Sequence, residues 1–317
     1  MTDHSPADLA RRYTRRAFSV LRVAGGLADA ADRDVARLGR ELIALIAGAD
    51  VGELGRRDLA ALLRDIDARI ATAFGTLGAS QVEAVREVLR IEAAWAAGTL
   101  VGSPPAESTL ARIARDFLAL GAKPADLWSR SGDTLASRIA DAVREAHALG
   151  TPVADVRARL GEIVATARRD AQSIADVSTT SAANAGHSEA ARENGAVAYR
   201  WHAVLDARTT TGCAVRHGLL YTLELEPIGH SVPIERPPPR HYGCRSLLVT
   251  LGRMPRPTDR PVGSFEEFIA GMSIDEQNDV LGKGRAELWR RGVLTKADLV
   301  NQRGRVLTLA ELRARPD

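Results

Sequence analysis

A chain of 317 residues with 45% hydrophobic residues is long enough for two or three domains and has the composition of an ordinary globular protein. Its formal net charge of +3 is small for this length, and no block of five or six like charges occurs, which excludes the strongly basic footprint of a dedicated nucleic-acid-binding protein. Only three of the 43 basic residues are lysines, an arginine bias that we attribute to a GC-rich genome rather than to recognition.

Two cysteines, Cys213 and Cys244, are too few for a disulfide framework. The segment Met1–Pro6 has no basic-then-apolar signal pattern. No apolar run approaches the roughly 18–20 residues that cross a bilayer. We therefore expect a protein made in the cytoplasm, with no membrane-spanning segment.

Residues 8–172 carry apolar side chains at helical spacing and predict helices throughout. The two clearest stripes are Leu38, Leu42, Ile43, Leu45 and Ile46, and Leu59, Leu62, Leu63, Ile66 and Ile70. Further helices are expected over 80–98, 108–120, 133–149 and 153–183. Gly150 ends one helix and Pro152 opens the next. This half shows no catalytic pattern, so its expected role is to pack as a bundle or to present a partner-binding face.

The pattern changes after Gly195, where alternation over 197–205 predicts a strand. A Thr/Gly loop follows, and further strands are expected over 218–223 and 245–251. The irregular segment 224–244 is long for a compact domain, and a metal ion clipping its ends together would explain why it is tolerated.

The last residues predict a small helical appendage. Residues 253–261 are proline-rich and predict a linker. Capping boxes at Ser264 and Thr308 each predict the start of a helix. Another helix is expected over 280–291, ending at Gly292.

Taken along the chain, these patterns predict an α+β protein with three regions. The predicted regions are a long, mainly helical N-terminal half (1–172), a small α+β central domain that contains the cysteines (173–252), and a linker with a short helical C-terminal tail (253–317).

Each cysteine has a histidine nearby, as Cys213-x3-His217 and His241-x2-Cys244. Zinc favours four such ligands in a tetrahedron, and spacings of two to four residues let one turn supply two of them. These four residues therefore predict a closed, structural zinc site. Three alternatives stay open: two buried thiols beside surface histidines, a catalytic Cys–His pair, and a disulfide, which would need an oxidising compartment.

Asp206 and Arg208 follow the first predicted strand. Asp206 either caps the turn or replaces a metal ligand, and Arg208 is expected to pair with a carboxylate or a backbone carbonyl. The run Pro237–Pro239 stiffens the chain just before His241, which lowers the entropic cost of ordering that histidine.

Residues 173–252, about a quarter of the chain, resemble the head morphogenesis family of tailed phages that is named for the F protein of phage Mu. The residues that carry the resemblance are Asn184, Trp201, Asp206, Arg208, Thr209, Cys213, Gly218, Pro238, Pro239, His241, Cys244, Arg245 and Ser246. Many members have a further cysteine where this chain has Thr210. Either His217 supplies that ligand here, or the site binds no metal.

The resemblance implies a minor capsid protein that acts in head assembly and in DNA packaging or ejection. It implies a place in the virion, in the capsid interior or at the portal vertex, after a period in the host cytoplasm during assembly. The implied partners are the portal protein and the major capsid or scaffolding protein. Weak, non-specific DNA contact is compatible with the small net charge.

We expect no enzymatic activity, and two alternatives remain. The first is a capsid maturation protease that uses a Cys–His dyad, although neither a G-x-S-x-G elbow nor an H-E-x-x-H pair occurs. The second is a toxin effector carried in the phage head, although no histidine follows His241 and the tail shows no catalytic cluster.

Overall fold

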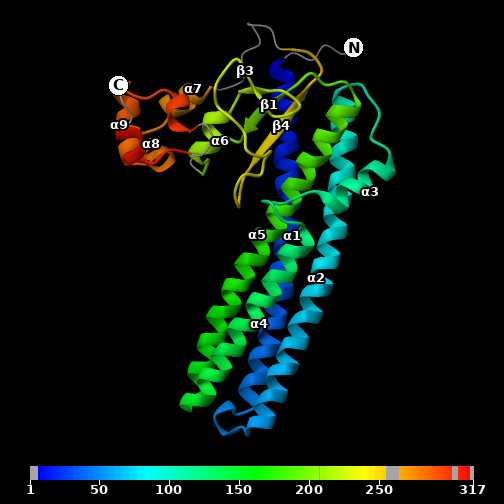
Figure 1. Cartoon of the computed structure of the whole chain (residues 1–317), viewed down its shortest axis with the longest axis vertical. Coiled ribbons are helices and arrows are strands. Elements are labelled where there is room, and N and C mark those ends of the chain that lie inside the picture. Colours follow the sequence, from blue (N-terminus) through cyan, green and yellow to red (C-terminus); the bar gives the residue numbers. More distant parts are fainter. Residues whose placement is uncertain (1–5, 207, 255–263, 302–305, 315–317) are drawn as a thin grey trace. The chain divides into compact units, whose positions relative to one another are not determined.

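The computed structural model describes residues 6–206, 208–254, 264–301 and 306–314 (Figure 1). The helices are α1 (Pro6–Gly48), α2 (Arg56–Thr99), α3 (Glu107–Asp116), α4 (Pro124–Leu149), α5 (Val153–Glu193), α6 (Thr211–Arg216), α7 (Phe265–Ala270), α8 (Ile274–Leu281), α9 (Lys283–Arg290) and α10 (Leu309–Arg313). Two 3-10 turns lie at Val51–Glu53 and Lys296–Leu299. The strands are β1 (Ala198–Ala203), β2 (Leu220–Tyr221), β3 (Pro227–Ile228) and β4 (Ser246–Leu251). The predicted α+β class is confirmed, with long N-terminal helices, a small central sheet and short C-terminal helices.

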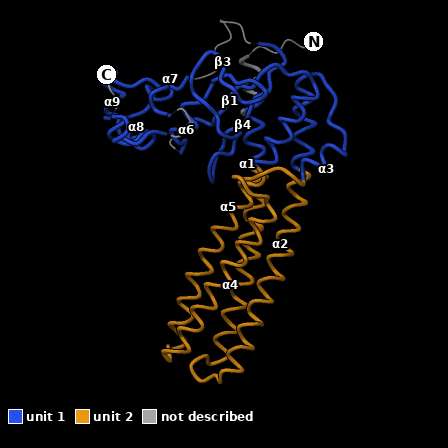
Figure 2. Tube along the Cα trace, in the orientation of Figure 1, with its two compact units in different colours: residues 1–21, 88–114, 180–317 blue, residues 22–87, 115–179 orange. Residues whose placement is uncertain are grey.

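The residues group into two compact units (Figure 2). The helical unit consists of Arg22–Glu87 and Arg115–Thr179. The sheet unit consists of Met1–Leu21, Val88–Ala114 and Thr180–Asp317. The domain boundaries predicted at 172/173 and 252/253 stay predictions.

The helical unit is built from parts of α1, α2, α4 and α5, whose apolar stripes meet in one core. Its buried side chains include Leu42, Ile46, Ile66, Ile70, Phe74, Trp128, Ile139, Val143 and Leu160. The stripes predicted at 59–70 and 80–98 belong to the single 44-residue helix α2. Helix α4 ends as predicted at Gly150, which adopts a left-handed conformation with a φ of 61°.

The sheet unit contains a four-stranded antiparallel sheet in the order β3-β2-β1-β4. Strands β1 and β4 pair along six residues, from Ala198 opposite Leu251 to Ala203 opposite Ser246. Every residue of β4 is buried. The predicted strands at 197–205, 218–223 and 245–251 are confirmed as β1, β2 and β4, whereas β3 and α6 were not predicted.

The C-terminal helices pack their apolar residues into the same core as Trp201 and Val215 of the sheet unit. The capping boxes predicted at Ser264 and Thr308 are both present. The helix predicted over 280–291 corresponds to α9, which begins only at Lys283 because Gly282, with a φ of 80°, separates it from α8. Most of the predicted linker 253–261 lies outside the described residues. Among the helices that the structure describes, none is long and apolar enough to cross a membrane.

Candidate metal centre

The pairing of β1 with β4 brings the two cysteines together. Ser246, the first residue of β4, lies opposite Ala203, the last residue of β1. The chain that precedes β4 therefore runs beside the chain that follows β1. Cys244 lies in the first of these segments, and Cys213 lies on α6 in the second.

His241 and Cys244 occupy one tight turn. The Cys244 backbone N–H donates to the His241 carbonyl oxygen, with 3.2 Å between the two atoms. Gly243 has a φ of 69°, a left-handed conformation that a residue without a Cβ adopts at little cost. The x2 spacing of the pair thus corresponds to a turn that presents both side chains on one side.

Cys213, His241 and Cys244 form a cluster whose possible ligand atoms all lie within 4.8 Å of one another. The Sγ atoms of Cys213 and Cys244 are 3.7 Å apart, and Cys213 Sγ is 3.4 Å from His241 Nε2. Both cysteines are buried, and His241 is half-buried. Three of the four predicted ligands are therefore brought together.

The cluster fits the dimensions of a tetrahedral zinc site. Zinc–sulfur bonds of about 2.3 Å and zinc–nitrogen bonds of about 2.0–2.1 Å at tetrahedral angles place two sulfurs about 3.8 Å apart and a sulfur about 3.6 Å from a nitrogen. The distances of 3.7 Å and 3.4 Å in this chain are close to both values.

The orientation of the His241 ring also suits a ligand. Its Nδ1 lies 2.8 Å from the Tyr242 carbonyl oxygen, which only accepts hydrogen bonds. Nδ1 therefore carries a proton, and in the neutral ring the Nε2 lone pair faces Cys213. A carbonyl that holds the second ring nitrogen is the usual way in which proteins fix a metal-binding histidine.

The two thiols affect each other's ionisation. A hydrogen bond from Cys244 holds the pKa of Cys213 well below its usual range, against the opposing effect of burial. The same contact, together with burial, raises the pKa of Cys244. The hydrogen bond to Cys213 also raises the pKa of His241. The cluster thus favours a thiolate on Cys213, which is the form that binds a cation.

His217, the fourth predicted ligand, lies outside the cluster. Its Nδ1 accepts a hydrogen bond from the Ala203 backbone N–H at 3.1 Å, and its ring centroid is 5.3 Å from that of His202. The residue is buried, and its side chain satisfies a backbone N–H at the end of β1. The x3 spacing from Cys213 matched a zinc pattern, but the ring is turned toward the strand.

Asp206 also lies outside the cluster and makes a two-pronged ion pair with Arg245. The Asp206 carboxylate also caps the turn as predicted, by accepting the Arg208 backbone N–H at 2.9 Å. The hydrogen bond from Arg245 lowers the pKa of Asp206 to about 2. The buried Thr209 hydroxyl accepts the Asp206 backbone N–H at 2.9 Å. The Arg208 side chain is exposed, and the ion pair of Asp206 is made with Arg245.

Asn184 joins α5 to β4 inside the sheet unit. Its Oδ1 accepts the Leu248 backbone N–H at 3.1 Å, and its Nδ2 donates to the Ser246 carbonyl oxygen at 3.4 Å. The side chain is buried, so these bonds satisfy polar groups that water does not reach. Asn184 thus holds the strand that follows Cys244.

Trp201, another residue of the family pattern, is fully buried on β1 beside Arg216. The Arg216 guanidinium lies 5.9 Å from the centre of the Trp201 ring and donates to the Pro233 carbonyl oxygen at 2.8 Å. Burial lowers the pKa of Arg216 to about 10. Sequence reasoning missed this arginine, because nothing in its neighbourhood distinguishes it from the many surface arginines.

A second buried polar cluster in the sheet unit was also missed. Glu92 on α2 accepts hydrogen bonds from Arg16 Nε at 2.9 Å and from His187 Nε2 at 3.0 Å. The Trp95 ring covers the group, with its centroid 5.4 Å from that of His187. These residues fix α1, α2 and α5 to one another within that unit.

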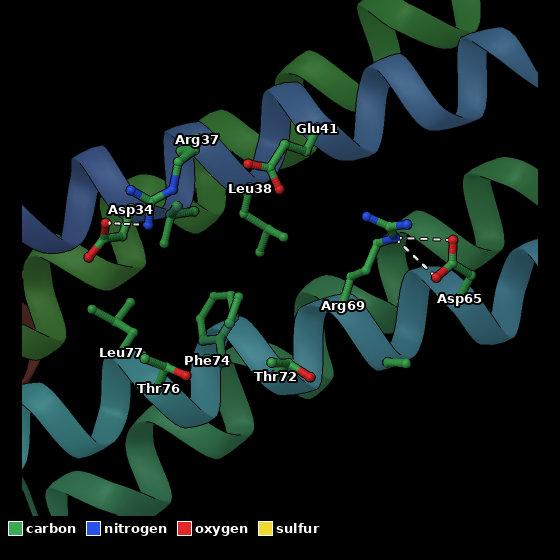
Figure 3. A pocket seen from close by; sticks show the side chains of 13 residues that line it. Asp34, Arg37, Leu38, Glu41, Asp65, Arg69, Thr72, Phe74, Thr76 and Leu77 are labelled. Atoms are coloured by element: carbon green, nitrogen blue, oxygen red, sulfur yellow. Dashed lines mark hydrogen bonds and ion pairs between the residues drawn. The ribbon is translucent and has the colours of Figure 1, made fainter.

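A cavity of about 570 Å³ lies between α1 and α2 of the helical unit (Figure 3). Leu38 of α1 and Phe74 and Leu77 of α2 lie between the two helices and form its apolar lining. Ion pairs flank the opening, Asp34 with Arg37 at 2.8 Å and Asp65 with Arg69 at 3.0 Å. The remaining lining residues are Val35, Glu41, Ala68, Thr72, Ala73 and Thr76. Ligand pockets commonly combine an apolar lining with a few polar groups, so this cavity, called the groove between α1 and α2 below, is a candidate binding site.

Comparison with known proteins identifies the central part of the chain. Residues 137–249 match the family model described as Phage Mu protein F like protein. No curated protein and no solved structure matches the chain. The matched segment contains Cys213, His241 and Cys244, and it includes all of the residues that carried the resemblance in the sequence. Residues 137–249 of this chain are therefore similar to the Phage Mu F-like family of phage head proteins, in agreement with the resemblance of the sequence pattern.

Proposed function

We propose that this chain is a minor, non-enzymatic component of a tailed-phage head. It lies inside the shell at the portal vertex and acts in head assembly and in DNA packaging or ejection. The match of residues 137–249 to the Phage Mu F-like family carries this proposal. The small net charge of +3 agrees with a protein that tolerates nearby DNA without binding it strongly.

Loss of the gene tests this function. Cells infected with a phage that lacks the chain are expected to accumulate defective or empty heads, and a copy supplied in trans is expected to restore normal ones. Normal numbers of filled, infectious particles without the chain would contradict the proposal.

The cluster of Cys213, His241 and Cys244 is proposed to hold a structural zinc ion. When bound, the ion links α6 to the turn before β4 and so closes the long loop between them. His241 Nδ1 keeps its proton on the Tyr242 carbonyl and leaves Nε2 free for the metal. Metal analysis of the purified chain is expected to give about one zinc per chain, and the double variant Cys213→Ser, Cys244→Ser is expected to lose it.

The portal protein is the partner proposed for the groove between α1 and α2. Its apolar lining suits an amphipathic helix, and the ion pairs at its rim suit a segment with both signs of charge. Thr72 is exposed at the lining of this groove. The variant Thr72→Arg fills the groove with a long charged side chain and is expected to weaken binding of purified portal protein at least about tenfold.

The matched control is Thr134→Arg, which makes the same change at an exposed position of α4 away from the groove. It is expected to leave portal binding unchanged. Equal binding by both variants would exclude the groove as the contact, while leaving membership of the head untouched.

A capsid maturation protease is the second candidate, because Cys213 Sγ lies 3.4 Å from His241 Nε2 as in a Cys–His dyad. Cys213 is only 4% exposed, which gives a substrate little access to its sulfur. Infection with phage that carries Cys213→Ser is expected to yield normally processed capsid protein. Unprocessed capsid protein in that infection, with the variant chain folded, would favour the protease.

A further inference from the structure

The Thr210 hydroxyl lies at the edge of the metal cluster, next to His241. Its Oγ1 lies 3.0 Å from His241 Nε2, the atom that faces the two sulfurs. The Thr210 carbonyl oxygen also accepts a hydrogen bond from the Cys213 backbone N–H at 3.0 Å. A metal ion held by the three ligands would therefore lie beside this hydroxyl.

Solvent reaches the cluster from this same side. Cys213 and Cys244 are 4% and 1% exposed, so the sulfur ligands belong to the interior. Thr210 and Tyr242, by contrast, are exposed. The coordination position opposite the buried sulfurs is thus the one that a small solute can approach.

No fourth strong ligand is in reach among the residues that the structure describes. The cluster contains three residues of the Cys, His, Asp and Glu types, and His217 is bound to the Ala203 backbone. A neutral hydroxyl is not one of the usual protein ligands of zinc. Three protein ligands with water in the fourth position is instead the arrangement of open zinc sites.

We propose that this centre keeps one coordination position open and that the position takes a single thiolate from outside the chain. The inference rests on the zinc centre proposed above. The Thr210 hydroxyl holds the water that occupies the position at rest. On exchange the metal–water bond breaks, a metal–sulfur bond forms, and the proton of the incoming thiol goes to solvent, with no change in oxidation state. A thiolate is favoured because two of the three protein ligands are sulfur.

Cobalt(II) loaded into the full chain reports on this position, because its sulfur-to-metal absorbance grows with the number of thiolates bound. The probe is 2-mercaptoethanol, added with a phosphine reductant that keeps the cysteines reduced. We expect the absorbance to rise by about half, since a third metal–sulfur bond joins two. Gel filtration before the measurement confirms that the cobalt remains on the chain.

Three variants locate the position. Thr210→Cys puts a thiolate beside His241, so its cobalt form is expected to absorb about 1.5-fold more than the wild type. Added thiol is expected to leave the absorbance of this variant unchanged, because the position is already filled. Thr210→Val keeps the shape without the hydroxyl and is expected to bind cobalt and still respond. His217→Gln is expected to match the wild type, because that ring does not face the metal.

The outcomes separate this inference from the metal centre itself. The open position is overturned if the wild-type chain binds one cobalt, added thiol does not change its absorbance, and Thr210→Cys absorbs no more than the wild type. In that case the metal centre itself still stands. Release of cobalt by the thiol also overturns it. A chain that binds no cobalt at all overturns the metal centre and this inference together.

Discussion

Glu92 shows how a single buried charge is compensated in the sheet unit. Its side chain is 5% exposed and accepts hydrogen bonds from Arg16 and from His187. Burial raises the pKa of Glu92, but the hydrogen bonds and charges of His187 and Arg16 outweigh it and leave the pKa below its ordinary value. The carboxylate therefore stays ionised and bridges three helices of that unit.

Removing this charge is expected to be costly. Glu92→Gln leaves Arg16 and His187 without their anionic partner, and we expect a loss of about 2–4 kcal/mol in the free energy of unfolding. Urea denaturation measures the loss. Glu83→Gln is the control, because its ion pair with Arg86 is exposed and is worth less than about 0.5 kcal/mol. Equal losses in the two variants would contradict the account of Glu92.

His202 makes the stability of the sheet unit depend on pH. Burial, with repulsion from His217 and Arg200, lowers the pKa of His202 to about 4. The unfolded chain takes up this proton near its ordinary pKa of about 6.5, whereas the folded chain resists it. Stability from this residue is therefore complete above about pH 6.5 and is lost as the pH falls toward about 4.

The loss attributed to His202 is about 1–3 kcal/mol, which is reduced from the full value because the ring is only partly buried. Urea unfolding at pH 7.5, 5.5 and 4.5 compares the wild type with His202→Asn. The wild type is expected to lose more stability across this range than the variant. Parallel curves would show that another group carries the pH dependence.

Close packing of α2 against α5 within the sheet unit depends on one glycine. A Cβ at Gly186 would lie 2.6 Å from the Leu89 carbonyl oxygen and 3.0 Å from the Ala93 nitrogen. Both atoms belong to the backbone, so no side-chain rotation relieves the clash. Small residues nearby, Ala96, Ala97 and Ala190, continue the same contact.

We expect Gly186→Ala to lower the free energy of unfolding by about 1–3 kcal/mol because the helices must move apart. Gly161→Ala on the same helix is the control, since its Cβ would meet nothing within 4 Å. It is expected to gain about 0.5–1 kcal/mol from better helix propensity. Thermal or urea unfolding gives both values, and a neutral Gly186→Ala would contradict the packing described.

The elements that the sequence predicted well are those with many repeats of one period. The stripes of α1 and α2 and the alternation of β1 carry their signal over many residues, and capping boxes mark single helix starts. Strand β3, with two residues, and helix α6, with six, are too short to show a period. The interruption at Gly282 depends on its positive φ, which spacing does not show.

The metal cluster was predicted in part for a similar reason. The His241 and Cys244 pair is local and lies in one turn, so its spacing was informative. Whether His217 joins it depends on the Ala203 N–H, a partner that only the folded strand supplies. Glu92 and Arg216 are buried, although charged residues usually lie at the surface. The groups that they contact are distant in the sequence, so the sequence alone did not predict their burial.

At the scale of the whole molecule, two separate cores predict two separate responses to metal removal. The helical unit and the sheet unit each have their own buried cluster. Chelation is expected to raise hydrogen exchange in α6 and β4 and to leave protection in residues 22–87 and 115–179 unchanged. Cys213→Ser is expected to show the same pattern without a chelator, and a uniform rise in exchange would contradict this.

Quantitative mass spectrometry of purified heads is the most direct test of the central claim, that this chain is a minor head protein. The measurement compares its amount with those of the portal and major capsid proteins, in precursor heads and in mature heads. The account predicts a level at or below that of the portal protein. Absence of the chain from both kinds of head would contradict it.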